Sequence, residues 1–123
     1  MAYDERLAIR IQECLGQTDA LAELKMFGGW CATVDGNMAV GVLGNDVIVR
    51  VGPDAYAEAL SEPGVREFDF AGRPMAGWVF VNGRSVDTAE ALEAWVERGI
   101  AFARSLPPKT QATRERTKRR SGG

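Results

Sequence analysis

The chain contains no histidine among its 123 residues. Histidine is the side chain that most often acts as a general base near neutral pH, and it is the commonest metal ligand. Its absence excludes serine–histidine and cysteine–histidine hydrolases, HExxH metalloproteases and histidine-bound zinc. Any catalysis would have to use carboxylate, lysine, tyrosine or cysteine chemistry.

Cysteine is almost as scarce, since Cys14 and Cys31 are the only two. They are too far apart for a CxxC pair and too few for a zinc set. We expect ordinary buried or half-buried thiols, because cysteine outside disulfides behaves mostly as a small hydrophobic residue. A redox-sensing pair is the alternative, and we expect no metal or other cofactor.

No apolar run approaches the length of a membrane span, and the N-terminal segment 1–6 carries acidic charge where a signal peptide would be basic. These absences predict a cytoplasmic protein with no membrane partner. Hydrophobic residues make up 46% of the chain, which is ordinary for a soluble globular protein, and the length suffices for one core.

The formal net charge is −2, but the charge is unevenly distributed. From residue 107 onward Glu115 is the one acidic residue, which leaves a net charge of −7 on residues 1–106. The basic residues of this C-terminal stretch are Lys109, Arg114, Arg116, Lys118, Arg119 and Arg120. Because residues 109–123 also lack apolar periodicity, we expect a folded domain over 1–108 and a disordered basic tail over 109–123.

The centre of the chain reads as an antiparallel meander. The turn sequences at 35–37 and 44–46 separate apolar runs and predict strands near 25–34, 38–43 and 47–51. Gly28 and Gly29, inside the first of these, indicate a bulge or a close backbone approach. Residues 17–24 are consistent with a short helical turn or an irregular connector.

Helices are predicted on both sides of the meander. Amphipathic spacing predicts a first helix over 4–15, turn residues bound a second over 52–64, and a third follows Asp87 as its N-cap. Two more strands are expected near 65–70 and 75–81. The fold class is therefore α+β, a single domain of order α-β-β-β-α-β-β-α with a mostly antiparallel sheet packed against helices. Gly99 in the apolar stripe of the third helix predicts a close helix-to-strand contact.

Five separated stretches of the sequence resemble the N-terminal domain of the TfoX/Sxy family, a small module associated with regulation of competence genes. They are Lys25–Gly29, Asn37–Val42, Val49–Pro53, Phe70–Met75 with Gly77–Val79, and Phe102–Pro107. The resemblance covers about residues 1–108 and implies a single α+β domain, here a stand-alone member without the helical C-terminal domain of larger members. It supplies no catalytic residues.

Four residues are candidates for interaction. Arg50 alternates with valines in a predicted strand and would need a salt-bridge partner, extend to water, or contact an anion together with Lys25 or Arg73. Trp78 is either a core residue or an exposed partner of Arg73 in an interface. Carboxylates at 35, 46, 54 and 87 are explained by turns and caps.

Three functions stay open on the sequence alone. The first is a non-enzymatic, TfoX-like regulatory or protein-interaction module that binds a protein partner, including a second copy of itself through a sheet edge. The second is an anionic-ligand-binding protein or enzyme that uses Lys25, Arg50 and Arg73. The third is nonspecific nucleic-acid association through the basic tail, which has no aromatic residue to stack on bases.

Overall fold

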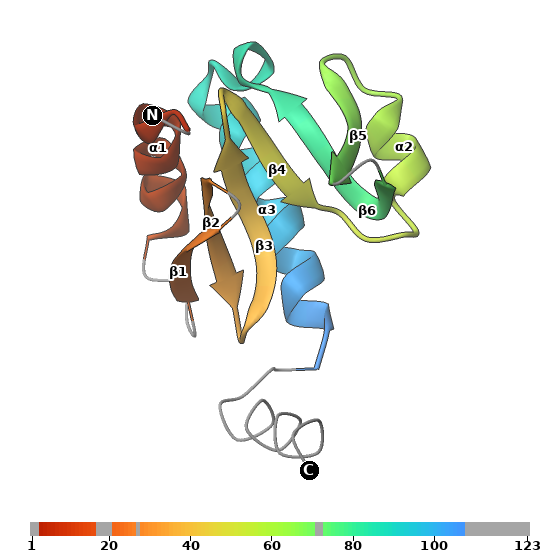
Figure 1. Ribbon diagram of the computed structural model, residues 1–123, viewed down its shortest axis with the longest axis horizontal. Coiled ribbons are helices and arrows are strands. Elements are labelled where there is room, and N and C mark those ends of the chain that lie inside the picture. The colour runs from red at the N-terminus through yellow and green to blue at the C-terminus, as the bar shows by residue number, and fades with distance from the viewer. Residues whose placement is uncertain (1–2, 17–20, 27, 71–72, 108–123) are drawn as a thin grey trace.

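The computed structural model describes residues 3–16, 21–26, 28–70 and 73–107 (Figure 1). The elements in chain order are α1 (Glu5–Leu15), β1 (Leu21–Met26), β2 (Gly29–Val34), β3 (Asn37–Leu43), β4 (Asp46–Arg50), α2 (Tyr56–Leu60), β5 (Val65–Phe70), β6 (Arg73–Asn82), the 3₁₀ helix η1 (Gly83–Val86) and α3 (Ala89–Ser105). The predicted α+β class is confirmed. The predicted tail, 109–123, lies outside the described residues.

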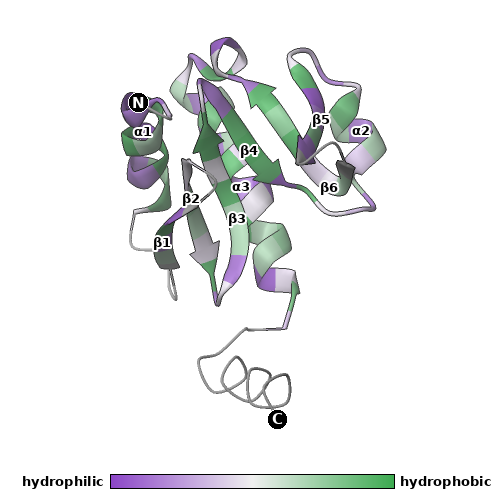
Figure 2. Cartoon of the chain, in the orientation of Figure 1, coloured by the Kyte–Doolittle hydropathy of each residue, from purple (hydrophilic) through white to green (hydrophobic). Residues whose placement is uncertain are grey.

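The strands form a six-stranded sheet in the order β1-β2-β3-β4-β6-β5. Every neighbouring pair is antiparallel, in agreement with the prediction of a mostly antiparallel sheet. β1 and β5 are the two edge strands. Figure 2 shows apolar residues along the central strands, which agrees with their burial.

The strand predicted over 25–34 is two strands, so four strands rather than three precede α2. β1 occupies the second half of the stretch predicted as a helical turn or connector, and it pairs with β2 from Leu21↔Val34 to Met26↔Gly29. The glycine pair therefore lies at a hairpin turn and not at a bulge. The predicted close approach is present, because a Cβ on Gly29 would lie 2.4 Å from the carbonyl oxygen of Val42.

The α-helices of the described chain, α1, α2 and α3, pack on one face of the sheet. Their buried residues, among them Ile11, Ala59 and Trp95, belong to one large hydrophobic cluster together with the valines of β3, β4 and β6. In Figure 1 α3 runs behind the sheet, so the viewer looks at the opposite face. That face carries a second, smaller cluster made of strand residues alone: Ile48, Phe68 and Phe80, flanked by Met38, Leu43 and Trp78.

The last helix is α3, and it begins one residue later than predicted. Thr88, not Asp87, is its N-cap, and the Thr88 hydroxyl oxygen accepts a hydrogen bond from the Ala91 amide at 3.1 Å. The backbone of Asp87 is helical because that residue closes η1. The predicted contact at Gly99 is confirmed, since a Cβ there would lie 2.4 Å from the carbonyl oxygen of Ala39 in β3. Of the helices described, none is long and apolar enough to cross a membrane.

Candidate interaction site

Arg50 and Trp78 lie side by side at one end of the strand-only cluster. β4 and β6 pair so that Arg50 is directly opposite Trp78, and the guanidinium carbon lies 4.9 Å from the centre of the indole ring. The same carbon lies 5.3 Å from the ring of Phe102 on α3. Both distances are within the range of cation–π attraction. The two aromatic rings therefore hold the guanidinium at the end of β4.

Two other arginines of the described chain lie over aromatic rings, and both are ion-paired. Arg66 lies over Phe80 and donates to Asp46 at 2.6 Å. Arg98 lies over Trp95 and donates to Glu62 at 2.8 Å. Arg50 differs from both, because no carboxylate or carbonyl oxygen in the described part of the chain accepts a hydrogen bond from it.

Partial burial changes the pKa of the Arg50 guanidinium. Desolvation lowers the pKa of Arg50 from its usual value, and no acidic neighbour offsets the effect. An arginine still stays charged in a protein, and its five N–H donors form a planar fork that matches a carboxylate or phosphate. Arg50 is therefore a half-buried cation whose fork is available to an external anion.

Lys25 is not part of this arrangement. The register runs Lys25↔Trp30, Trp30↔Val42 and Val42↔Val47, so three strand spacings and three residues along β4 separate Lys25 from Arg50. With about 4.8 Å per spacing and about 3.3 Å per residue, the two backbones are roughly 17 Å apart. The structure does not bring Lys25 and Arg50 to one anion.

The other candidate residues are only partly within the described structure. The backbone of Arg73 opens β6 opposite Phe70, but its side chain lies outside the described residues, as do the tail residues 109–120. Trp78 is half-buried against the second cluster, with Phe68 6.1 Å away between ring centres. It therefore has one surface in the protein and another toward Arg50 and solvent.

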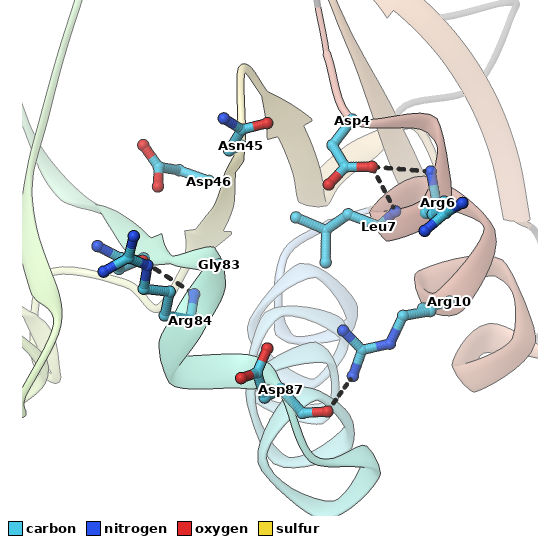
Figure 3. Close-up of a pocket in the computed structure, with 10 residues that line it drawn as sticks. Asp4, Arg6, Leu7, Arg10, Asn45, Asp46, Gly83, Arg84 and Asp87 are labelled. Carbon is cyan, nitrogen blue, oxygen red and sulfur yellow. Dashed lines mark hydrogen bonds between the residues drawn. The ribbon is translucent and has the colours of Figure 1, made fainter.

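A polar pocket of about 670 Å³ lies between α1, the β3–β4 turn and η1 (Figure 3). The charges of its lining balance, with Asp4, Asp46 and Asp87 against Arg6, Arg10 and Arg84. Arg10 donates to the carbonyl oxygens of Val86 and Asp87, and Asp46 is paired with Arg66, which lies outside the pocket. Arg6 and Arg84 lie on opposite sides of it and do not converge (Figure 3). This geometry gives no common point at which both guanidiniums could hold one anion.

The cysteines and carboxylates form no further centre among the described residues. Cys14 is half-buried on α1 and Cys31 is buried on β2, and no disulfide joins them. Burial is the main reason that the pKa of both thiols is raised from the usual value, which favours the less reactive protonated form. No group of three carboxylate or thiol side chains in the described part of the chain could hold a metal ion.

Phe102 is the residue of the site that the sequence did not indicate. It lies in the apolar stripe of α3, where a helical pattern predicts only core packing. Its contact with Arg50 depends on how α3 crosses the end of β4, and spacing within one helix carries no such information. Strand alternation predicts that Arg50 shares a face with Ile48 and lies opposite Val49 and Val51, and the structure agrees, since Ile48 and Trp78 belong to the strand-only cluster and the two valines to the large one.

The comparison with protein families gives one result. The family model described as the TfoX N-terminal domain matches residues 13–103, which extend from the end of α1 through all six strands into α3. No match was found among curated proteins or among solved structures. Since the matched range covers most of the chain, this chain belongs to the TfoX N-terminal domain family.

Proposed function

We propose that this chain is a non-enzymatic, TfoX-like regulatory module that binds an acidic segment of a partner protein at the strand-only face of its sheet. The observation that carries the proposal is Arg50, the half-buried arginine that lacks an acceptor among the described residues while Arg66 and Arg98 both have one. A partly desolvated cation is stabilised when an anion supplies the missing hydrogen bonds. A carboxylate of the partner would do this.

The surroundings of Arg50 suit a protein partner better than a small ligand. Trp78, Met38 and Leu43 are partly exposed on this face, over the buried residues Ile48, Phe68 and Phe80. Tryptophan and arginine are among the residues most enriched where binding energy is concentrated. Lys25 lies too far away to share a small anion with Arg50. An acidic peptide can place one carboxylate on the guanidinium and apolar groups along the sheet.

Arg50→Ala is expected to weaken binding of a glutamate-rich peptide at least about tenfold, because a hydrogen bond between two charged groups contributes about 1.5–3 kcal/mol. The affinity is measured by following the indole N–H resonance of Trp78 during titration with the peptide. Arg98→Ala is the matched control, since it removes an arginine that also lies over an aromatic ring but is ion-paired within the protein and lies on α3, away from the strand-only face. The control should bind nearly as well as the wild type.

The same three proteins are then used to recover partners from extract of the native cell. The proposal requires that proteins retained by the wild type and by Arg98→Ala are lost with Arg50→Ala. Equal recovery by all three, together with equal peptide affinity, would show that Arg50 is only a structural residue.

A second function, nonspecific nucleic-acid association, is favoured by the six basic residues after residue 107. Each phosphate neutralised by lysine or arginine releases counterions, so six contacts would give a slope of about −5 for log affinity against log salt. We expect the full chain to bind random duplex DNA with such a slope and a chain ending at Pro108 to lose most of that affinity. If the shortened chain binds equally well, the tail is not the source.

A further inference from the structure

We propose that the outer edge of β1 pairs with β1 of a second copy of this chain, in antiparallel register about Leu24, to give a twofold-symmetric dimer with one continuous sheet. β1 is at the end of the sheet, so one side of its backbone has no strand beside it in the described structure. Unpaired N–H and C=O groups at an edge form a template for another strand. The inference is independent of the site at Arg50.

The charges of β1 select the register. Glu23 and Lys25 are both exposed and flank Leu24, which keeps 47% of its surface exposed. In an antiparallel pair centred on Leu24, Glu23 of each copy lies directly opposite Lys25 of the other, and the two Leu24 side chains meet at the axis. Opposite charges in directly facing positions stabilise a strand pair, and like charges destabilise it.

Other registers of β1 lack this complementarity. Centring the pair on Glu23 places two carboxylates against each other, and centring it on Lys25 places two ammonium groups against each other. Glu23 is also held in place within its own copy, since its Oε1 accepts hydrogen bonds from Gln12 at 2.6 Å and from the Trp30 indole at 3.1 Å. One partner of each intermolecular ion pair is therefore already oriented.

The opposite edge strand, β5, does not have this property. Its sequence from 65 to 70 places Arg66, Glu67 and Asp69 along the edge. Centring an antiparallel pair on Phe68 sets Glu67 against Asp69 of the other copy, and centring it on any of the three charged residues sets that residue against itself. Each register centred on residues 66–69 of β5 therefore opposes like charges, whereas the register of β1 centred on Leu24 opposes unlike ones, so β1 is the edge better suited to a second copy.

The test uses the position on the twofold axis, where each residue faces its own counterpart. We expect sedimentation of the wild-type chain to show a monomer–dimer equilibrium that shifts with concentration. Leu24→Lys and Leu24→Asp should each associate at least tenfold more weakly than the wild type, because each places two like charges in contact. An equimolar mixture of these two variants should recover the dimer, since lysine then faces aspartate.

Two further variants complete the experiment. Met75→Lys also places a lysine at an exposed apolar position, 37% exposed on β6, and should leave the equilibrium unchanged. Lys25→Glu should weaken association by setting Glu23 against the new carboxylate. A wild-type chain that stays monomeric at its highest attainable concentration, or variants that dimerise like the wild type, would overturn the proposal. Arg50→Ala should leave the dimer intact, so failure here is distinct from failure at the Arg50 site.

Discussion

Replacing Gly99 by alanine is expected to lower the free energy of unfolding by about 2 kcal/mol, although alanine is the better helix former. A Cβ at this position would lie 2.4 Å from the carbonyl oxygen of Ala39, 2.7 Å from Cγ1 of Val40 and 3.1 Å from the carbonyl carbon of Ala39. Two of these obstacles are backbone atoms of β3, which lies inside the sheet between β2 and β4.

The clash at Gly99 cannot be relieved by turning a side chain. β3 is paired on both sides, so α3 would have to move away from the sheet and loosen the packing of Trp95 and Val96 in the core. Overpacking costs about 1–3 kcal/mol where side chains can adjust, and a backbone obstacle belongs at or above the upper end of that range. The gain of about 1 kcal/mol in helix propensity offsets only part of it.

Urea unfolding followed by tryptophan fluorescence measures the effect. Ala101→Gly is the control, because it makes the reverse change at an exposed position of the same helix and should cost only about 1 kcal/mol through propensity. A Gly99→Ala protein as stable as the wild type would mean that α3 is not held against β3 as closely as described.

The close contact at Gly99 illustrates what the sequence can predict. Glycine lowers helix stability, so a glycine in the apolar stripe of a helix indicates that another backbone packs closely against it. The structure shows this close contact between Gly99 and β3. The face of the sheet on which Arg50 lies can also be predicted from the sequence, because Arg50 alternates with Val49 and Val51 in the strand and these valines are in the core. Both features depend on the local period of one element.

β1 was missed because its sequence carries two competing patterns. Leu21 and Leu24 are three residues apart, which suggests a helix, while Glu23 and Lys25 alternate with Ala22 and Leu24 as in a strand. An edge strand is exposed along one side and contains few hydrophobic residues, so the alternation of apolar and polar residues that marks a strand is weak. Pairing with β2 decides its conformation, and no local pattern encodes that pairing.

The contacts of Arg50 could not be predicted from the sequence for a related reason. Arg50 on β4 contacts Trp78 on β6 and Phe102 on α3, and these three elements are distant in the sequence. The sequence suggested Lys25 and Arg73 as the cations that could contact an anion together with Arg50. The register places Lys25 three strands away from Arg50, and the described side chains that contact the guanidinium are the aromatic rings of Trp78 and Phe102.

Gly52→Ala is expected to destabilise the protein by about 3 kcal/mol and to disturb the Arg50 site as well. Gly52 has φ +89°, a backbone conformation that residues with a side chain rarely adopt. A Cβ added at Gly52 would lie 2.4 Å and 2.5 Å from two ring carbons of Phe102. The amides of Val51 and Gly52 both donate to the carbonyl oxygen of Gly77, at 2.8 Å and 3.0 Å, so this segment cannot simply move away.

The two causes of this loss can be separated. Gly44 also has positive φ, at +60°, but nothing lies within 4 Å of its Cβ position, so Gly44→Ala measures backbone strain alone, about 1 kcal/mol. Adding Phe102→Leu to Gly52→Ala removes the ring that the new methyl meets. In a double-mutant cycle the combined variant should therefore be less destabilised than the sum of the single changes.

The same cycle connects the fold to the proposed function. Because the methyl on residue 52 displaces the ring that lies 5.3 Å from the Arg50 guanidinium, Gly52→Ala should weaken binding of the glutamate-rich peptide while Gly44→Ala should not. If the two variants bind the peptide equally well, Phe102 takes no part in holding Arg50. Additive free energies in the cycle would likewise contradict the contact between Gly52 and the ring, and either result can be obtained at a temperature where both variants remain folded.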